Sequence, residues 1–223
     1  MRHQQEWNSR QSFPLVTAIC PTRNREEWLP RAIRCFQMQS YPNLEMIIAA
    51  DGEDVQTTIA NSLAPELGAV KPQHPVRYIY LEKQLTIGAK RNFLCSRANG
   101  TVIVHWDDDD LSHPDRVRFQ MQAILSGAKV TGFYRCRFRD WEADRLYQWH
   151  SSQFLPCGSS LMYLKSWWQT HEFRQINVGE DSDFVERSTG YWHSSDGDAL
   201  FEASIHRANT SPRDLSMDMY TPL

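Results

Sequence analysis

Residues 15–50 read LVTAICPTRNREEWLPRAIRCFQMQSYPNLEMIIAA, and their pattern decides the fold. The apolar runs 15–20 and 44–50 have the length and composition of buried strands. Between them, five apolar side chains recur on one helical stripe: Trp28, Leu29, Ala32, Ile33 and Phe36. The helix is expected to end at 41–43, because Pro42 cannot continue it. The stretch therefore predicts a strand–helix–strand unit.

The same alternation continues through the next sixty residues. Helices are predicted near 55–63 and over 90–98, and strands over 76–81 and 101–106. Strands that alternate with helices form a mainly parallel sheet, since each helix returns the chain to the same end of the sheet.

The C-terminal half has a different pattern, in which strands follow one another. Residues 130–138 and 145–149 predict antiparallel strands, and a Gly-Ser turn, a helix near 180–188 and a strand near 200–206 come next. No linker or repeat interrupts the chain. We expect one α/β domain over 1–223, with a mainly parallel sheet flanked by helices and a small antiparallel portion in the C-terminal half.

Two predicted helix starts have the spacing of N-terminal caps. Asn24 is followed three residues later by Glu27, and Ser112 by Asp115, with Pro114 between them. A short polar side chain at the first of these positions can accept a hydrogen bond from the first helical turn. Both helices are therefore predicted to be capped.

Composition and charge narrow the classes of partner and compartment. The net charge is -3 and the basic residues are scattered, so nucleic acid is not an expected partner. Five cysteines without a CxxC favour a reducing compartment, and we predict a cytoplasmic protein. The polar start and the lack of a long apolar run predict no transmembrane segment and, at most, peripheral membrane contact.

The densest charge in the sequence is the acidic run Asp107-Asp108-Asp109-Asp110, directly after the strand predicted over 101–106. Taken alone, such a run is more often a solvated loop that caps the next helix. Four adjacent carboxylates repel one another, and alternate residues share a side, so Asp107 and Asp109 can face one cation. A hard divalent metal would relieve that repulsion.

Polar residues also follow two other predicted strands. Thr22 comes after the first strand and Asp51 after the second. In open α/β sheets, ligands bind beyond the carboxyl ends of the strands. Together with the acidic run, these residues predict a ligand site at that edge of the sheet.

Short motifs follow one another in a fixed order along the chain. The first group consists of Pro21-Thr22, Asn24, Gln39-x-Tyr41-Pro42, Asp51-Gly52, Gly88 to Asn92, and the acidic run. The second group consists of Gly158 to Met162, Gly179-Glu180-Asp181 with Arg187, and His206-x-x-Asn209-x-Ser211. Their order and spacing resemble those of the family 2 glycosyltransferases, in which the acidic run corresponds to a DxD-type element. The resemblance covers residues 15 to about 211.

This resemblance implies a GT-A fold and an inverting glycosyltransferase. A nucleotide-binding half over about 14–115 would bind a nucleotide-sugar donor, in this case a UDP-sugar. An acceptor half over about 116–211 would bind a glycan, a lipid-linked acceptor or a protein. No QxxRW follows the Gly179 motif, which indicates a non-processive enzyme.

The resemblance also implies roles for individual residues. Asp181 matches the catalytic base, with Glu180 beside it in the motif. Donor contacts are carried over to Pro21, Thr22, Asn24, Asp51, Lys90, Arg91, Asn92, Asp107 and Asp108. Manganese or magnesium would be held by Asp109, Asp107 and His206, and would act as a Lewis acid.

Other interpretations stay open at this stage. Asp181 can be a carboxylate that stabilises a helix N-terminus, and His206 a structural histidine. Asp51 can simply begin a turn at Asp-Gly, where the family often has two aspartates. A sugar nucleotidyltransferase is disfavoured because residues 21–24 are not glycine-rich. A catalytically silent sugar-nucleotide or glycan-binding module of the same fold remains an alternative.

Overall fold

The fold is seen in a computed structural model that describes residues 13–52, 73–211 and 213–223. Its N-terminal part contains β1 (Val16–Thr22), α1 (Leu29–Gln37), β2 (Leu44–Ala50), β3 (Val76–Tyr80), α3 (Ile87–Arg97), β4 (Val102–His105), β5 (Leu111–Ser112) and α4 (Arg116–Leu125). Its C-terminal part contains β6 (Val130–Asp140), β7 (Arg145–His150), η1 (Gly158–Ser160), β8 (Met162–Leu164), α5 (Lys165–Trp168), α6 (Glu180–Arg187), β9 (Trp192–Asp196), β10 (Phe201–Ile205) and β11 (Tyr220–Pro222).

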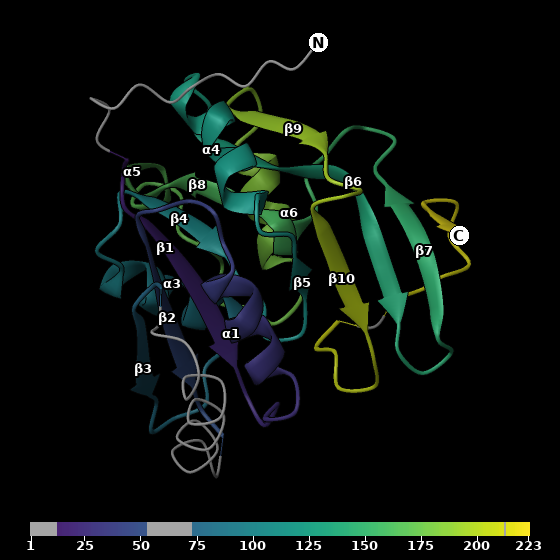
Figure 1. Cartoon of the computed structure of the whole chain (residues 1–223), viewed down its shortest axis with the longest axis horizontal. Coiled ribbons are helices and arrows are strands. Elements are labelled where there is room, and N and C mark those ends of the chain that lie inside the picture. Colours follow the sequence, from purple (N-terminus) through teal and green to yellow (C-terminus); the bar gives the residue numbers. More distant parts are fainter. Residues whose placement is uncertain (1–12, 53–72, 212) are drawn as a thin grey trace.

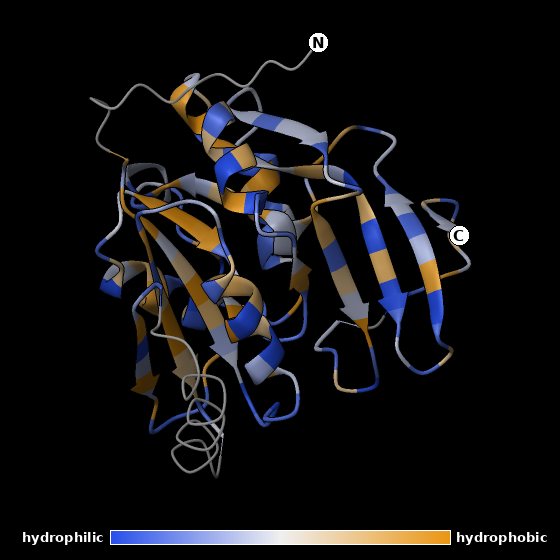
Figure 2. Ribbon diagram, in the orientation of Figure 1, coloured by the Kyte–Doolittle hydropathy of each residue, from blue (hydrophilic) through white to orange (hydrophobic). Residues whose placement is uncertain are grey.

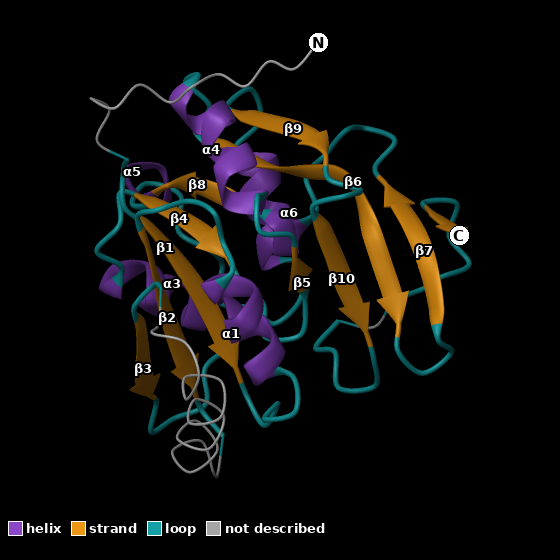
Figure 3. Cartoon of the chain, in the orientation of Figure 1, coloured by secondary structure: helices purple, strands orange, loops and turns teal. Residues whose placement is uncertain are grey.

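The strands form one mixed sheet with the path β11-β7-β6-β8-β4-β1-β2-β3. The segment β4-β1-β2-β3 is parallel, as the alternating sequence pattern predicted (Figure 1). β7 and β8 run antiparallel to β6, whereas β9 and β10 run parallel to it. The predicted α/β fold class is confirmed, and the C-terminal strands extend the sheet further than expected because β6 pairs with four others (Figure 3).

Alternation along the buried strands divides the core into two layers. Val16, Ala18 and Cys20 of β1 pack with α1 and α4 on one face, while Ile19 packs with α3 and α6 on the other. Helices cover both faces of such a parallel sheet, so the strands at its centre are mainly apolar. Figure 2 shows this apolar centre in β1, β2 and β4, with the hydrophilic residues concentrated in the loops and in the outer strands.

Both predicted helix caps are wrong. α1 begins at Leu29 after Trp28, which makes no capping hydrogen bond, and Asn24 lies in the preceding loop with a φ of 50°. α4 begins at Arg116 after Asp115, which makes no capping hydrogen bond, and the Ser112 hydroxyl accepts from Arg116 (2.8 Å). Both helices therefore begin later than the spacing predicted.

Other element boundaries moved for local reasons. α3 starts at Ile87 rather than at residue 90, because the Thr86 hydroxyl accepts from the Ala89 amide (3.2 Å) and caps it. The strands β8, β9 and β11 were not predicted. The helix predicted near 55–63 lies outside the described residues. In the described part of the chain, no helix is long and apolar enough to cross a bilayer.

Candidate active site

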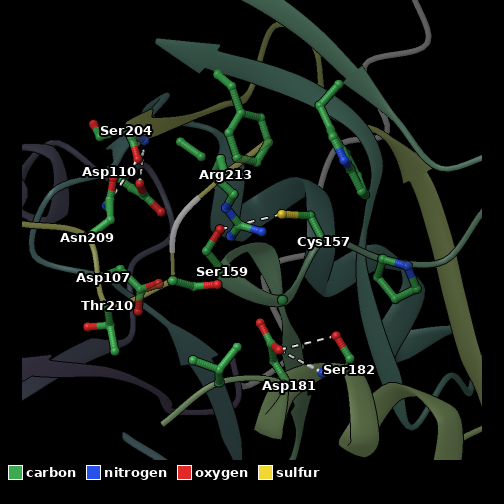
Figure 4. Close-up of a pocket in the computed structure, with 18 of the residues that line it drawn as sticks. Asp107, Asp110, Cys157, Ser159, Asp181, Ser182, Ser204, Asn209, Thr210 and Arg213 are labelled. Carbon is green, nitrogen blue, oxygen red and sulfur yellow. Dashed lines mark hydrogen bonds between the residues drawn. The ribbon is translucent and has the colours of Figure 1, made fainter. Parts of the chain in front are cut away.

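A cavity of about 880 Å³ opens beyond the carboxyl ends of β1 and β4. Its walls come from segments far apart in the sequence: Pro21 and Arg25, the run Asp107–Asp110, residues 149–159, 177–182, 203–211 and 213–219. Figure 4 shows Asp107, Asp181, Asn209 and Arg213 around this space. The structure thus brings the acidic run and the Gly179 motif, 70 residues further along the chain, into one cavity.

The four carboxylates of the acidic run face different partners. Asp108 accepts from the Thr22 hydroxyl (2.5 Å) and from Arg25 (2.8 Å), and Asp110 accepts from the Ser204 amide (2.9 Å). Burial, opposed by Arg25, raises the pKa of Asp108 to about 6, and burial likewise raises the pKa values of Asp107 and Asp110. Only part of the negative charge of the run is therefore compensated by the protein.

One oxygen of Asp109 collects three donors. Its Oδ2 accepts from Arg25 (2.8 Å), from His206 Nε2 (2.9 Å) and from the Asn209 amide (3.2 Å). Arg25 also donates to the Ala208 carbonyl (2.5 Å), and the Trp28 ring stacks on His206 with centroids 4.4 Å apart. The loop between β1 and α1 is thereby joined to the 206–209 turn across the acidic run.

These residues fit a divalent cation as part of a coordination shell. Asp109 Oδ1 has no hydrogen bond from another described residue, and the Asp107 side chain is 23% exposed, with Arg91 no nearer than 3.3 Å. Both carboxylates line the cavity, and oxygen is the donor that manganese and magnesium prefer. Among the described residues, no three acidic, histidine or cysteine side chains converge to hold a metal. The remaining ligands would have to come from a bound diphosphate and water.

Arg91 connects the acidic run to α6. It is buried in α3, forms an ion pair with Glu180 and lies 3.3 Å from Asp107. Burial, opposed by Arg91, raises the pKa of Glu180 to about 7. Glu180 is 4% exposed, and among the described residues the side chain that bonds to its carboxylate is Arg91, so this carboxylate supports Arg91. An arginine held between two carboxylates fixes the distance between α3, α6 and the end of β4.

Asp181 lies at the first turn of α6, after Gly179 turns the chain with a φ of 84°. Its Oδ1 accepts from the Ser182 amide (2.7 Å). A Cβ built on Gly158 would lie 1.7 Å from Asp181 Oδ2, so the carboxylate packs directly on the Gly158 backbone. The position therefore requires glycine at 158 and leaves Asp181 among the residues that line the cavity (Figure 4).

Several residues predicted to contact the donor are engaged inside the protein. Lys90 donates to Asp51 (2.6 Å) and to the Thr22 carbonyl (3.0 Å), and the Asp51 side chain is fully buried. Asn92 donates to the Phe173 carbonyl (2.8 Å), and its oxygen accepts from Trp168. Asn24 lies against Gly52. Pro21, Arg91, Asp107 and Asp108 line the cavity, whereas Asn24, Asp51, Lys90 and Asn92 do not. The contacts of Lys90 join α3 to β1 and β2.

Sequence reasoning missed two cationic residues of the cavity, Arg25 and Arg213. Arg25 directly follows the motif residue Asn24, and this position in the sequence is a signal that could have placed Arg25 in the site. Arg213 follows the last recognised motif, and nothing in its local sequence distinguishes it from a surface arginine.

Residues 17–190 match the sequence model of glycosyl transferase family 2. The chain belongs to glycosyltransferase family 2. The matched range contains the acidic run, the Gly158 loop and Asp181, and it ends before His206 and Arg213. The predicted GT-A fold is confirmed by solved structures of glycosyltransferases. S. aureus TarS 1-349 with UDP-GlcNAc has a TM-score of 0.69 at 14% identity, covering 88% of this chain and 60% of that chain. Mannosyltransferase PcManGT from Pyrobaculum calidifontis with GDP-Man and Mn2+ has a TM-score of 0.68 at 12% identity, covering 89% and 59%.

Curated relatives of this family 2 domain carry glycosyltransferase names. An uncharacterized glycosyltransferase of Haemophilus influenzae is 26% identical over 136 residues, which is 60% of this chain and 52% of the relative. The putative teichuronic acid biosynthesis glycosyltransferase TuaG of Bacillus subtilis is 25% identical over 54% of this chain and 46% of the relative. The match thus spans about half of the length of these two proteins.

Proposed function

We propose that this family 2 domain transfers a sugar from a UDP-sugar to an acceptor hydroxyl on a glycan, a lipid-linked acceptor or a protein. The transfer inverts the anomeric carbon and occurs once per encounter. The observation that carries the proposal is that Asp181 and the acidic run Asp107–Asp110 line the same cavity. A base for the acceptor and a charged edge for the donor diphosphate are the two parts that such a transfer needs.

In this proposal Asp181 takes the proton of the acceptor hydroxyl through Oδ2. The Ser182 amide holds Oδ1 at 2.7 Å, and the Gly158 backbone limits the movement of Oδ2. A carboxylate fixed in this way can act as a general base without forming a bond to the sugar. The acceptor oxygen then attacks in line and the configuration at the anomeric carbon inverts.

The donor diphosphate is assigned to the edge formed by Pro21, Arg25, Arg91 and the acidic run. Glu180 is assigned the role of positioning Arg91, whose charge stays fixed beside Asp107. The ligands proposed for manganese or magnesium are Asp107, Asp109 and, once it leaves Asp109, His206. The metal would supply Lewis-acid neutralisation of the charge that develops on the leaving diphosphate.

The choice of UDP is supported by the fold neighbour TarS, which is solved with UDP and with UDP-GlcNAc, while PcManGT is solved with GDP-Man. Five free cysteines support a reducing compartment, and we propose the cytoplasm. Any membrane contact is proposed to be peripheral.

Calorimetry tests the donor site directly. UDP, GDP, dTDP and CDP are titrated into the full chain with manganese or with chelator, and the best pair is repeated on Asp109→Ala. We expect UDP to bind best, with manganese, and binding to weaken at least tenfold in the variant. If only GDP binds, guanine replaces uracil as the nucleotide base of the proposed donor. If binding does not depend on manganese, the metal is removed from the proposal.

Release of UDP from UDP-sugars, with water and with an acceptor panel, separates an enzyme from a silent binding module. An enzyme releases UDP and does so faster with an acceptor. Tight nucleotide binding with no release from any donor would instead favour the binding module.

A further inference from the structure

The cavity has a second wall, which is formed by the end of β7 with the residues after it and by residues near the C-terminus. We name it the C-terminal wall and define it as residues 149–153 and 213–219, all of which line the cavity except Asp214 and Leu215. This wall is held in place by the sheet: β11 pairs with β7, the His150 amide donates to the Met219 carbonyl (3.0 Å), and Tyr220 packs edge-on against Phe138 with centroids 5.4 Å apart. The segment that carries Arg213 is therefore anchored at its far end.

Arg213 places a positive charge in this wall. Its guanidinium lies 5.6 Å from the centre of the Phe138 ring, and Cys157 and Tyr220 are its neighbours. No ion pair joins it to a carboxylate of the described residues. Asp181 and Asp110 attract it from beyond ion-pair distance. Its charge is consequently only partly compensated.

The less exposed arginines near the cavity are satisfied differently. Arg25 and Arg91 each form ion pairs with two carboxylates. Among the described residues Arg116 has no ion pair, but it donates to Ser112, Gln120 and two backbone carbonyls, and it does not line the cavity. Arg213 is exposed, lines the cavity and forms no ion pair with the described residues, so its guanidinium is available to bind an anion.

Arg213 and Asp181 lie on two sides of one short segment. Asp181 packs on Gly158, and Cys157 and Ser159 on either side of that glycine are hydrogen bonded to each other (3.5 Å). Figure 4 shows the Arg213 guanidinium directed toward Cys157 and Ser159, with Asp181 beyond Ser159. An acceptor whose hydroxyl meets Asp181 would therefore extend its next substituents toward Arg213.

The rest of the C-terminal wall has the chemistry of a carbohydrate site. The Trp149 indole lines the cavity, as do the polar side chains of Ser151, Ser152 and Gln153. An aromatic ring can cover the apolar face of a sugar, and hydroxyl and amide groups can bond to its hydroxyls.

We infer that Arg213 binds the negative charge of an anionic acceptor, which is a sugar or polyol that carries a carboxylate or a phosphate. The inference rests on the proposed function, because it assigns this wall to the acceptor. The inference specifies the chemical class of acceptor that the transferase selects. A guanidinium presents parallel donors that match either anion.

The test uses the full chain with UDP-sugar and two matched pairs of acceptors. One pair is p-nitrophenyl β-glucoside and p-nitrophenyl β-glucuronide, and the other is glycerol and glycerol 3-phosphate. We expect an anionic member to have at least about tenfold higher kcat/KM than its neutral partner, as one charge-assisted pair supplies. The pair that shows the preference identifies carboxylate or phosphate as the group.

Variants separate an acceptor role from the alternatives. Arg213→Gln should remove the anionic preference while the Kd for UDP with manganese stays within twofold of the parent, and Arg213→Lys should retain part of the preference. Arg145→Gln, an exposed charge change on the same strand as Trp149 and outside the cavity lining, is the control. A weaker Kd for UDP in Arg213→Gln would assign Arg213 to the donor diphosphate and overturn the inference.

Two further outcomes also overturn it: no preference in either pair with the parent protein, or equal losses for neutral and anionic acceptors in Arg213→Gln. If the parent protein binds no nucleotide, the proposed function itself is wrong. This outcome differs from a loss of the anionic preference, so failure of the proposed function and failure of the inference about Arg213 are distinguishable.

Discussion

The two walls of the cavity hold their charges in different ways. On the donor-side wall, Arg25 and Arg91 form ion pairs with Asp107, Asp108, Asp109 and Glu180, so cations and carboxylates are interleaved. On the C-terminal wall, Arg213 forms no ion pair with the described residues, a thiol and a phenol are its neighbours, and Asp218 lines the same wall. The donor-side wall is organised before any ligand arrives, whereas the C-terminal wall leaves one charge for a ligand.

The largest expected effect is on the base between the two walls. Asp181→Asn keeps the shape of the side chain but cannot accept the acceptor proton, so kcat should fall by about 10²–10⁴ while the Kd for UDP is unchanged. Steady-state kinetics and calorimetry measure the two quantities. Asp183→Asn is the control, because Asp183 lies in the same helical turn but pairs with Arg174 and Arg187 outside the cavity. Equal kcat in Asp181→Asn and the parent would remove Asp181 from the mechanism.

Breaking the ion pairs of the donor-side wall should lower stability. Arg91→Met leaves Glu180 and Asp107 without their cation, and we expect the free energy of unfolding to drop by about 3–5 kcal/mol in urea denaturation. Arg174→Met removes an ion pair whose arginine is 68% exposed and should change it by less than about 1 kcal/mol. Similar losses in the two variants would show that the buried pair is no more important than a surface pair.

Arg25 tests whether the donor-side wall is neutralised in advance. Arg25→Ala removes the guanidinium that lies 2.8 Å from Asp109 Oδ2 and leaves His206 and Asn209 as the donors to that oxygen. With one positive charge fewer beside the carboxylate, the variant should bind manganese about tenfold more tightly in the absence of nucleotide. Electron paramagnetic resonance of free manganese gives the Kd. Arg207→Ala is the matched control, since Arg207 lies in the 206–209 turn beside the acidic run but forms an exposed ion pair with Glu142. Weaker manganese binding in Arg25→Ala would mean that Arg25 supports the site.

The smallest effect concerns Cys157, whose thiol lines the cavity next to Arg213. A hydrogen bond from Cys136, opposed by burial and assisted by Arg213, lowers the pKa of Cys157 to about 7. The thiolate forms as pH rises, so alkylation of Cys157 should increase with pH with a midpoint near 7, read by peptide mass spectrometry. Cys136→Ala and Arg213→Gln should each move the midpoint upward. A midpoint near 8.5 in the parent, the value of a free thiol, would show that these neighbours do not act on Cys157.

Local patterns predicted most of the parallel core. The runs at 15–20, 44–50, 76–81 and 101–106 became β1, β2, β3 and β4. Of these, β1, β2 and β4 are buried at every position, and strands buried on both faces are mainly apolar. The caps at Asn24 and Ser112 failed because α1 and α4 begin later than predicted, at Leu29 and Arg116. β11 was missed because three residues that pair with a distant edge strand have no periodicity to detect.

The sequence by itself determined the strand–helix alternation and the residue types of the candidate site, since periodicity and motif spacing are local properties. Only the tertiary structure decided which of those residues reach the cavity. It turned Asp51, Lys90 and Asn92 toward contacts inside the protein and brought Arg25 and Arg213 to the cavity. The reason is physical: whether a charged side chain finds a partner or faces open space depends on groups that the fold brings together from distant parts of the chain.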